Sequence, residues 1–221
     1  MKMTPITSRR ERLCLFTRYP EPGTTKTRLI PLLGKTGAAD LQRRMTVHVL
    51  EKVRRLAVQR GVSVEIRYEG GDEGRMKQWL GTDLAFAIQG TGDIGRRMAR
   101  AFKTAVADGF DTTVIIGSDI PGITAGILAQ AFDWLEQKDL VFGPARDGGY
   151  YLIGIEVLCL KKAAPGLFNH IDWGTETVLA KTLHTADTLD LTYSLLDYLG
   201  DVDRPADIAH WEKVIAGMER Y

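Results

Sequence analysis

The chain has 221 residues, of which 44% are hydrophobic and 26% charged, and its formal net charge is +1. This length and composition suit one α/β domain with a sizeable core, so we expect a single domain over residues 1–221. A net charge so close to zero excludes a global field that would attract nucleic acid or an anionic membrane. Any anion site must therefore be local.

The two cysteines, Cys14 and Cys159, lie in apolar runs and are too few for a disulfide framework. We expect both to be buried. No apolar run has the length of a signal-peptide core or approaches the ~18 residues of a membrane span. The sequence therefore predicts a soluble, cytoplasmic protein without a membrane span and without a nucleic-acid partner.

Short runs rich in β-branched and aromatic residues predict strands over Leu13–Thr17, Val62–Tyr68, Leu84–Gln89, Thr112–Gly117, Leu140–Gly143 and Tyr150–Ile155. Helical patterns predict helices over Ala38–Arg60, Glu73–Leu80, Ile94–Ala107, Ala125–Gln137, Thr175–Thr185 and Pro205–Met218. This alternation is typical of the α/β class, with a mostly parallel sheet covered on both faces. The last two strands have no room for a crossover helix between them, so we expect that pair to be antiparallel.

Unusual residues follow four of the predicted strands, and in an open α/β sheet such connections converge on one crevice. The first connection combines turn formers with cations: Arg18, Pro22, Gly23, Lys26 and Arg28. Its backbone amides and cations are suited to phosphate oxygens. The alternative is that the cations merely solvate an exposed loop.

The second connection, Gln89 to Gly95, contains a G-x-G-x-x-G pattern between a strand and a helix. Gln89, Gly92 and Asp93 are candidate nucleotide contacts. The alternative is a tight glycine turn in which Asp93 caps the following helix.

The third connection follows a buried strand and begins with Ser118 and Asp119. A carboxylate at this position is suited to Mg²⁺, which prefers one or two carboxylates together with phosphate oxygens and water. The alternative is that Asp119 caps the helix that starts near Thr124. We place Ser118 among the candidate nucleotide-binding residues.

The fourth connection holds Asp147, Gly148, Gly149 and Tyr150, whose paired glycines allow a ligand to approach the main chain. An ordinary hairpin turn explains the same residues. Asp203 precedes Pro205 at the last predicted helix, and the pattern alone indicates ordinary helix-start chemistry. Trp173 is a candidate acceptor contact, although a core-facing Trp is the commoner outcome.

Together these motifs resemble a bacterial family of GT-A-like glycosyltransferases within the nucleotide-diphospho-sugar transferase superfamily. The motifs that carry the resemblance are Phe16–Leu29, Gln89–Met98, Gly117–Pro121 and Gly143–Gly154, and it extends from about Leu13 to Ile208. The resemblance implies a GT-A fold, a three-layer α/β/α arrangement with a central mixed, mostly parallel sheet.

The resemblance also implies roles for individual residues. Arg18, Lys26 and Arg28 would contact the triphosphate, and Asp119 would hold a divalent ion, Mg²⁺ or Mn²⁺. Asp203 would be a second metal ligand, because residues 202–208 are similar to the V-D-T-P-E-D-L segment of related nucleotidyltransferases. The sequence departs from the Asp-x-Asp motif of glycosyltransferases.

The leading hypothesis is a Mg²⁺-dependent transferase that joins a nucleotidyl group from a nucleoside triphosphate to a phosphorylated acceptor and releases pyrophosphate. Lys26 and Arg28 would neutralise the leaving pyrophosphate. The turn at Gly92 and Asp93 would contact base or ribose, and residues 147–150 with Trp173 would line the acceptor side.

Three alternatives remain from the sequence. One is glycosyl transfer from a nucleotide-sugar donor to a sugar-like acceptor. Another is an NAD-dependent oxidoreductase built on the glycine turn, and the last is a non-catalytic nucleotide-binding regulator.

Overall fold

The computed structural model describes residues 9–159, 166–209 and 211–213. Its centre is a seven-stranded sheet in the order β3-β2-β1-β4-β6-β5-β7. The strands are β1 (Glu11–Arg18), β2 (Ser63–Glu69), β3 (Ala85–Ile88), β4 (Thr112–Gly117), β5 (Leu140–Pro144), β6 (Tyr150–Glu156) and β7 (Tyr193–Leu195). Only β6 runs antiparallel to its neighbours, β4 and β5. The predicted mixed, mostly parallel sheet and the predicted antiparallel pair are confirmed.

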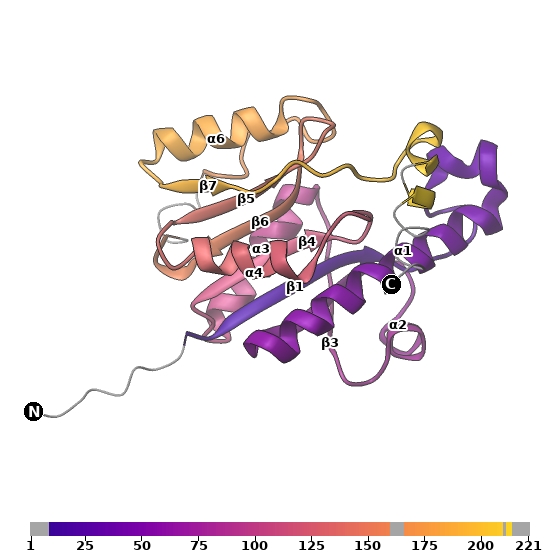
Figure 1. Ribbon diagram of the computed structural model, residues 1–221, viewed down its shortest axis with the longest axis horizontal. Coiled ribbons are helices and arrows are strands. Elements are labelled where there is room, and N and C mark those ends of the chain that lie inside the picture. Colours follow the sequence, from indigo (N-terminus) through magenta and orange to yellow (C-terminus); the bar gives the residue numbers. More distant parts are fainter. Residues whose placement is uncertain (1–8, 160–165, 210, 214–221) are drawn as a thin grey trace, which may run out of the picture.

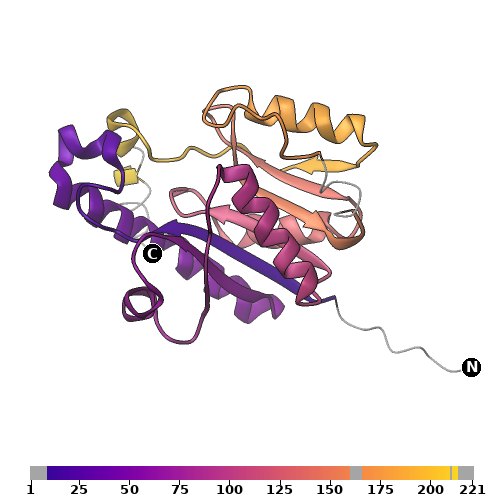
Figure 2. The same ribbon diagram turned by 180° about the vertical axis from the view of Figure 1, so that it is seen from behind.

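Helices cover both faces of the sheet (Figures 1 and 2). One face packs against α1 (Ile30–Arg60), α2 (Glu73–Leu80) and α4 (Ala125–Trp134), and the other against α3 (Ile94–Ala107) and α6 (Val178–Thr188). The alternation along β1 makes this possible: Leu13 and Leu15 belong to the first layer, whereas Cys14 and Phe16 belong to the second. The predicted three-layer α/β/α arrangement is confirmed.

The structure departs from the predicted elements at several ends. Helix α1 begins at Ile30 instead of Ala38, with a break at Gly34, whose φ is 69°. Helix α6 begins at Val178, and β7 was not predicted because three residues carry too little alternation. The predicted last helix begins as a 3₁₀ turn, η2 (Pro205–Asp207), and part of its range lies outside the described residues.

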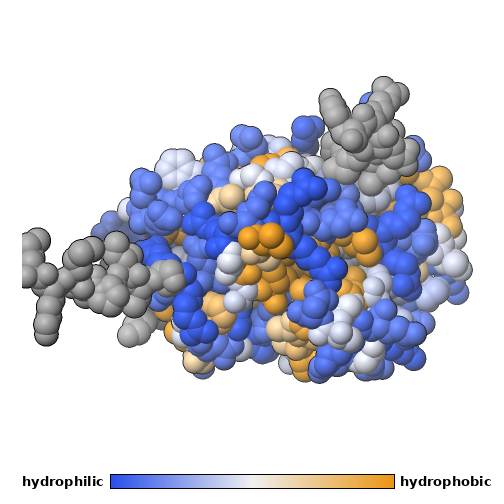
Figure 3. Space-filling view, turned by 60° about the horizontal axis from the view of Figure 1, so that its bottom comes forward, coloured by the Kyte–Doolittle hydropathy of each residue, from blue (hydrophilic) through white to orange (hydrophobic). Residues whose placement is uncertain are grey.

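Both cysteines, Cys14 and Cys159, are buried, as predicted. The surface seen in Figure 3 is largely hydrophilic, with hydrophobic side chains gathered in a band near its middle. No helix within the described ranges is long and apolar enough to cross a membrane. That the chain forms one domain stays a prediction.

A small third core joins the region of α1 to the segment that follows β7. Leu29, which directly precedes α1, and Met45, within α1, pack with Val202 and Trp211. Figures 1 and 2 show the segment after β7 crossing over to the beginning of α1. Because Leu29 and Val202 are fully buried, this contact fixes their sequence neighbours, Arg28 and Asp203, on the same side of the molecule.

Candidate active site

A cleft of three adjoining pockets opens at the carboxyl ends of the parallel strands. The basic pocket, about 460 Å³ in volume, is lined by charged and polar side chains that include Arg18, Lys26, Arg28, Gln89, Ser118, Asp119 and Asp203. The chamber, about 230 Å³, has Asp119, Asp147, Tyr150 and Trp173 among its lining residues. The rim pocket, about 690 Å³, lies around Arg146, Arg204 and Asp203. The four connections singled out in the sequence thus converge on one cleft, as predicted.

Lys26 lies at the centre of the cleft. Its ammonium nitrogen is 2.8 Å from Asp119 Oδ2, donates to the carbonyl of Val202 at 2.7 Å, and lies 3.9 Å from Asp203 Oδ1. The Lys26 side chain is only 7% exposed, and its backbone adopts the left-handed conformation, with φ at 47°. The predicted approach of Lys26 to Asp119 is therefore present in the structure.

Asp203 is presented by a turn that its own segment builds. Asp207 Oδ2 accepts the backbone N–H groups of Asp203 at 3.0 Å and Arg204 at 2.7 Å, which fixes the turn before η2. The Arg28 guanidinium forms an ion pair with Asp203. The structure thus brings Arg28 and Asp203 together, although they are far apart in the sequence.

Arg18 lines the basic pocket, and its guanidinium is already paired. It lies 2.6 Å from Glu69 Oε2 and donates to the Thr24 carbonyl at 3.1 Å. Arg97 lies 2.8 Å from the same carboxylate oxygen. Hydrogen bonds from Arg97 and Arg18 hold the pKa of Glu69 below its ordinary value. Arg18 therefore ties the first connection to β2, the strand that ends at Glu69.

The loop that carries Asp119 is held by buried polar side chains. Ser118 Oγ accepts a hydrogen bond of 2.9 Å from Gln42, and His48 Nε2 lies 3.0 Å from the Pro121 carbonyl. Helix α4 is capped by Thr124, whose Oγ1 accepts the Ile127 N–H at 3.1 Å. The alternative in which Asp119 caps this helix is therefore wrong, and its carboxylate faces the cleft.

The glycine turn after β3 has a structural explanation. Asp93 is the N-cap of α3 and accepts the Arg96 N–H at 2.8 Å. Gln89 is buried, and its amide nitrogen donates to the carbonyls of Thr17 and Arg67, both at 3.0 Å. Gln89 lines the basic pocket, whereas Gly92 and Asp93 line none of the three pockets. Contact of this turn with base or ribose stays a prediction.

The hairpin between β5 and β6 shapes the chamber. Asp147 Oδ1 accepts the Gly149 N–H at 2.9 Å. Gly148 has a φ of +88°, and a Cβ there would lie 2.1 Å from the carbonyl oxygen of Glu176. Gly148 therefore allows two segments to pack closely. Asp147 and Gly149 line the chamber.

Trp173 closes the apolar end of the chamber. Its ring contacts Tyr150 edge-on, with centroids 6.4 Å apart. A Cβ on Gly95 would lie 2.4 Å from the Trp173 ring. The last glycine of the G-x-G-x-x-G pattern therefore leaves the space in which the Trp173 indole packs. The sequence did not link these two residues.

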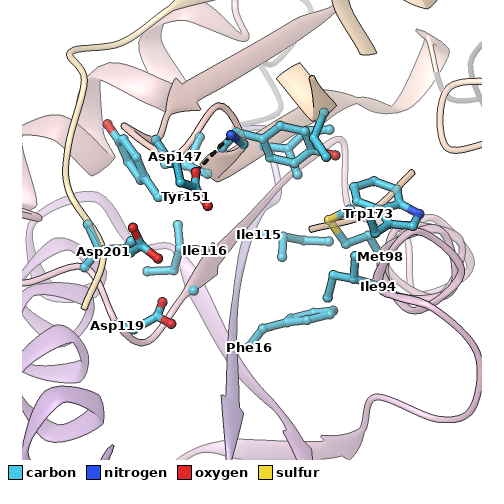
Figure 4. A pocket seen from close by; sticks show the side chains of 18 of the residues that line it. Phe16, Ile94, Met98, Ile115, Ile116, Asp119, Asp147, Tyr151, Trp173 and Asp201 are labelled. Atoms are coloured by element: carbon cyan, nitrogen blue, oxygen red, sulfur yellow. Dashed lines mark hydrogen bonds between the residues drawn. The ribbon is translucent and has the colours of Figure 1, made fainter. Parts of the chain in front are cut away.

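Asp201 is a site residue that sequence reasoning missed. It lines the chamber and the rim pocket, and Figure 4 shows its carboxylate on the same side of the chamber as those of Asp119 and Asp147. Burial and the negative charges of Asp119 and Asp147 raise the pKa of Asp201 to about 6. The only sequence signal was its place two residues before Asp203.

The oxygens around Lys26 are the candidate ligands of a divalent ion. No group of three or more His, Cys, Asp or Glu side chains in the described part of the chain is arranged to hold a metal ion. The Lys26 ammonium, itself a cation, is nevertheless held by oxygens of Asp119 and Val202, with Asp203 nearby. Such oxygens suit Mg²⁺ or Mn²⁺, which need only one or two carboxylates when phosphate and water complete the shell. The residues fit an ion, provided that Lys26 leaves this position.

Comparison with known proteins places the chain in a family. The model of the family described as "uncharacterized protein conserved in bacteria (DUF2064)" matches residues 52–175. The chain belongs to this family. No curated protein matches the sequence.

Among the solved structures similar to this family member are several that are named as transferases or synthetases. One is a "putative nucleotide-diphospho-sugar transferase" from Desulfovibrio desulfuricans G20, 35% identical, with a TM-score of 0.79 over 88% of this chain and 82% of that chain. The predicted resemblance to nucleotide-diphospho-sugar transferases is confirmed.

Two more distant structures share the fold alone. CMP:2-keto-3-deoxy-manno-octonic acid synthetase, complexed with CTP, is 12% identical, with a TM-score of 0.59 over 95% of this chain and 99% of that chain. Glucosyl-3-phosphoglycerate synthase from Mycobacterium tuberculosis, complexed with Mn²⁺, UDP and glucosyl-3-phosphoglycerate, is 14% identical, with a TM-score of 0.58 over 96% and 79% of the two chains. The predicted GT-A-type fold is confirmed.

Proposed function

We propose that the chain is a divalent-metal-dependent transferase that moves a nucleotidyl group from a nucleoside triphosphate to a phosphorylated acceptor and releases pyrophosphate. The observation that carries the proposal is the position of Lys26. Its ammonium group joins Asp119 and Val202, and lies near Asp203, at the wall of a pocket that Arg18 and Arg28 also line. Cations and carboxylates mixed in this way suit a polyphosphate bound with a metal ion.

Asp119 and Asp203 would hold the divalent ion, Mg²⁺ or Mn²⁺, and a bound ion neutralises charge on phosphate oxygens. Lys26 and Arg28 would bind the oxygens of the leaving pyrophosphate. Ser118 orients its neighbour Asp119, because a hydrogen bond from the buried Gln42 side chain holds Ser118 Oγ in place. Phosphoryl chemistry of this kind needs little covalent help, so positioning and charge neutralisation supply most of the rate.

The neighbouring structures support both nucleotidyl and glycosyl transfer on this fold. The synthetase neighbour was solved with CTP, and the glucosyl-3-phosphoglycerate synthase with Mn²⁺ and UDP. We favour nucleotidyl transfer because Asp119 is followed by Ile120 and Pro121 and not by the second aspartate of an Asp-x-Asp motif.

Product analysis tests the proposal. The protein is incubated with Mg²⁺ and a set of sugar phosphates, together with each nucleoside triphosphate in one series and with nucleotide sugars in a parallel series, and phosphorus NMR follows the reaction. Nucleotidyl transfer consumes the triphosphate and yields pyrophosphate together with a new diphosphate ester. Consumption of a nucleotide sugar with release of a nucleoside diphosphate, and no reaction of any triphosphate, would instead identify glycosyl transfer.

A further inference from the structure

The acceptor side of the cleft differs in chemistry from the phosphate side. The chamber adjoins the basic pocket, with which it shares Phe16 and Asp119, and has a volume of about 230 Å³. Sites for drug-sized ligands measure about 300–1,000 Å³. The chamber therefore fits a ligand, or a part of a ligand, that is smaller than a drug-sized molecule.

One end of the chamber is an apolar wall. Phe16, Ile94, Met98 and Trp173 lie together there, as Figure 4 shows. Phe16 and Met98 are buried in the second core layer, against which Trp173 packs. Because these side chains are fixed by the core, the wall presents a constant apolar surface to a ligand.

The other end of the chamber is acidic. The carboxylates of Asp119, Asp147 and Asp201 gather there (Figure 4), and within the described ranges no Lys or Arg lines the chamber. A divalent ion held by Asp119 would still leave two carboxylates facing the space. Carboxylates accept hydrogen bonds from hydroxyl and ammonium groups and repel anions.

The cations of the cleft lie outside the chamber. Lys26 and Arg28 line the basic pocket, and Arg146 and Arg204 line the rim pocket. The cations of the cleft thus lie in the basic pocket, where the phosphates of a nucleotide would lie, and in the rim pocket, whereas an anionic group inside the chamber would face carboxylates and no Lys or Arg among the described lining residues.

We infer that the phosphate of the acceptor lies outside the chamber, and that the part of the acceptor entering the chamber is compact and bears no carboxylate or second phosphate. Its hydroxyl or amino groups donate to Asp147 and Asp201, and its apolar face packs toward Phe16 and Trp173. The place of the phosphate rests on the proposed function, whereas the exclusion of a second anion follows from the charge of the chamber alone.

Glycerol 3-phosphate and 3-phosphoglycerate form a matched pair of ligands for the test. They are similar in size and differ mainly in a carboxylate that replaces a hydroxymethyl group. Calorimetric titration of the full chain in Mg²⁺ measures the two affinities. We expect glycerol 3-phosphate to bind at least about tenfold more tightly, because the added carboxylate faces two carboxylates of like charge.

Isosteric variants locate the origin of this preference. Asp147→Asn and Asp201→Asn each remove one negative charge from the chamber and should reduce the affinity ratio several-fold. Asp83→Asn removes the same charge from an exposed pair with Arg54 and should leave the ratio unchanged. Equal or tighter binding of 3-phosphoglycerate by the unmodified chain would overturn the inference. So would no binding of glycerol 3-phosphate, or a ratio that neither chamber variant alters.

The outcomes separate this inference from the proposed function. A chain that prefers glycerol 3-phosphate but releases no pyrophosphate from any triphosphate keeps the chamber's selectivity and loses the nucleotidyl reaction. A chain that releases pyrophosphate and accepts carboxylated phosphoesters equally well keeps the reaction and loses the selectivity.

Discussion

Replacing Lys26 by methionine tests the electrostatic balance of the cleft. Lys26→Met keeps most of the apolar stem of a side chain that is only 7% exposed, but it removes the ammonium group. The carbonyl of Val202 and the carboxylate of Asp119 lose their donor, and Asp203 loses a nearby positive charge. The variant therefore leaves oxygens without a cation.

The size of the effect follows from these contacts. Hydrogen bonds to charged groups contribute about 1.5–3 kcal/mol each when buried. Asp119 and Asp203 are each 34% exposed, so water weakens the loss, and we expect about 2 kcal/mol in total. In a chain of this length that corresponds to a fall in melting temperature of about 4–8 °C.

Magnesium should reverse this loss in the variant. With the ammonium gone, Mg²⁺ can occupy the position between Asp119 and Asp203, and an ion at a hundredfold excess over its dissociation constant stabilises the fold by about 2.7 kcal/mol. In the unmodified chain the ion must displace Lys26, so the same addition should raise the melting temperature less.

Thermal denaturation in EDTA and in Mg²⁺ measures both effects. Lys181→Met is the matched control, because it removes an ammonium that lies 2.5 Å from Asp172 on the surface. Water screens this exposed pair, so the control variant should lose little stability and should not respond to Mg²⁺. The reasoning is refuted if Lys26→Met is as stable as the unmodified chain. It is also refuted if Mg²⁺ raises the melting temperature of Lys26→Met and of the unmodified chain equally.

Two further predictions concern the support of the site. Gly95→Ala places a Cβ 2.4 Å from the Trp173 ring and should destabilise the fold by about 1–3 kcal/mol in urea denaturation. Gly126→Ala, at the matching position of α4 with 3.7 Å to its nearest neighbour, should be neutral or stabilising by up to about 1 kcal/mol; equal effects would contradict this packing. Burial lowers the pKa of His48 below its ordinary value of 6.5, so the unfolded chain takes up a proton first and stability falls as pH drops through about 6.5. His48→Gln should flatten this part of the stability–pH curve, and a curve as steep as that of the unmodified chain would speak against the buried neutral imidazole.

Much of the fold was predictable because the apolar runs of the strands and the glycine-rich connections between them are visible in the sequence. The apolar run ending at Gly117 and the glycine-rich link before Tyr150 fixed β4 and the antiparallel pair. Strand β7 was missed because its three residues lack a recognisable period. The predicted helix began at Ala38, so the first part of α1, from Ile30 to the break at Gly34, was missed.

The site was predicted less evenly than the fold. Lys26 and Asp119 were expected to meet because connections that follow parallel strands converge on one crevice, and the structure shows that their strands, β1 and β4, are neighbours. Asp203 was predicted as a site residue only through the family resemblance. Its position depends on the packing of its neighbour Val202 against Leu29, and no local sequence pattern predicts such a tertiary contact. Asp201 and the seating of Trp173 on Gly95 depend on the same kind of long-range packing.

Titration of the protein with each of the four nucleoside triphosphates, with and without Mg²⁺, tests most directly whether Lys26, Arg28, Asp119 and Asp203 hold a metal–polyphosphate. The account predicts that at least one triphosphate binds tightly only when Mg²⁺ is present, and that Asp119→Asn abolishes this dependence on the metal. Binding of no triphosphate, or binding of equal strength in EDTA, would contradict it.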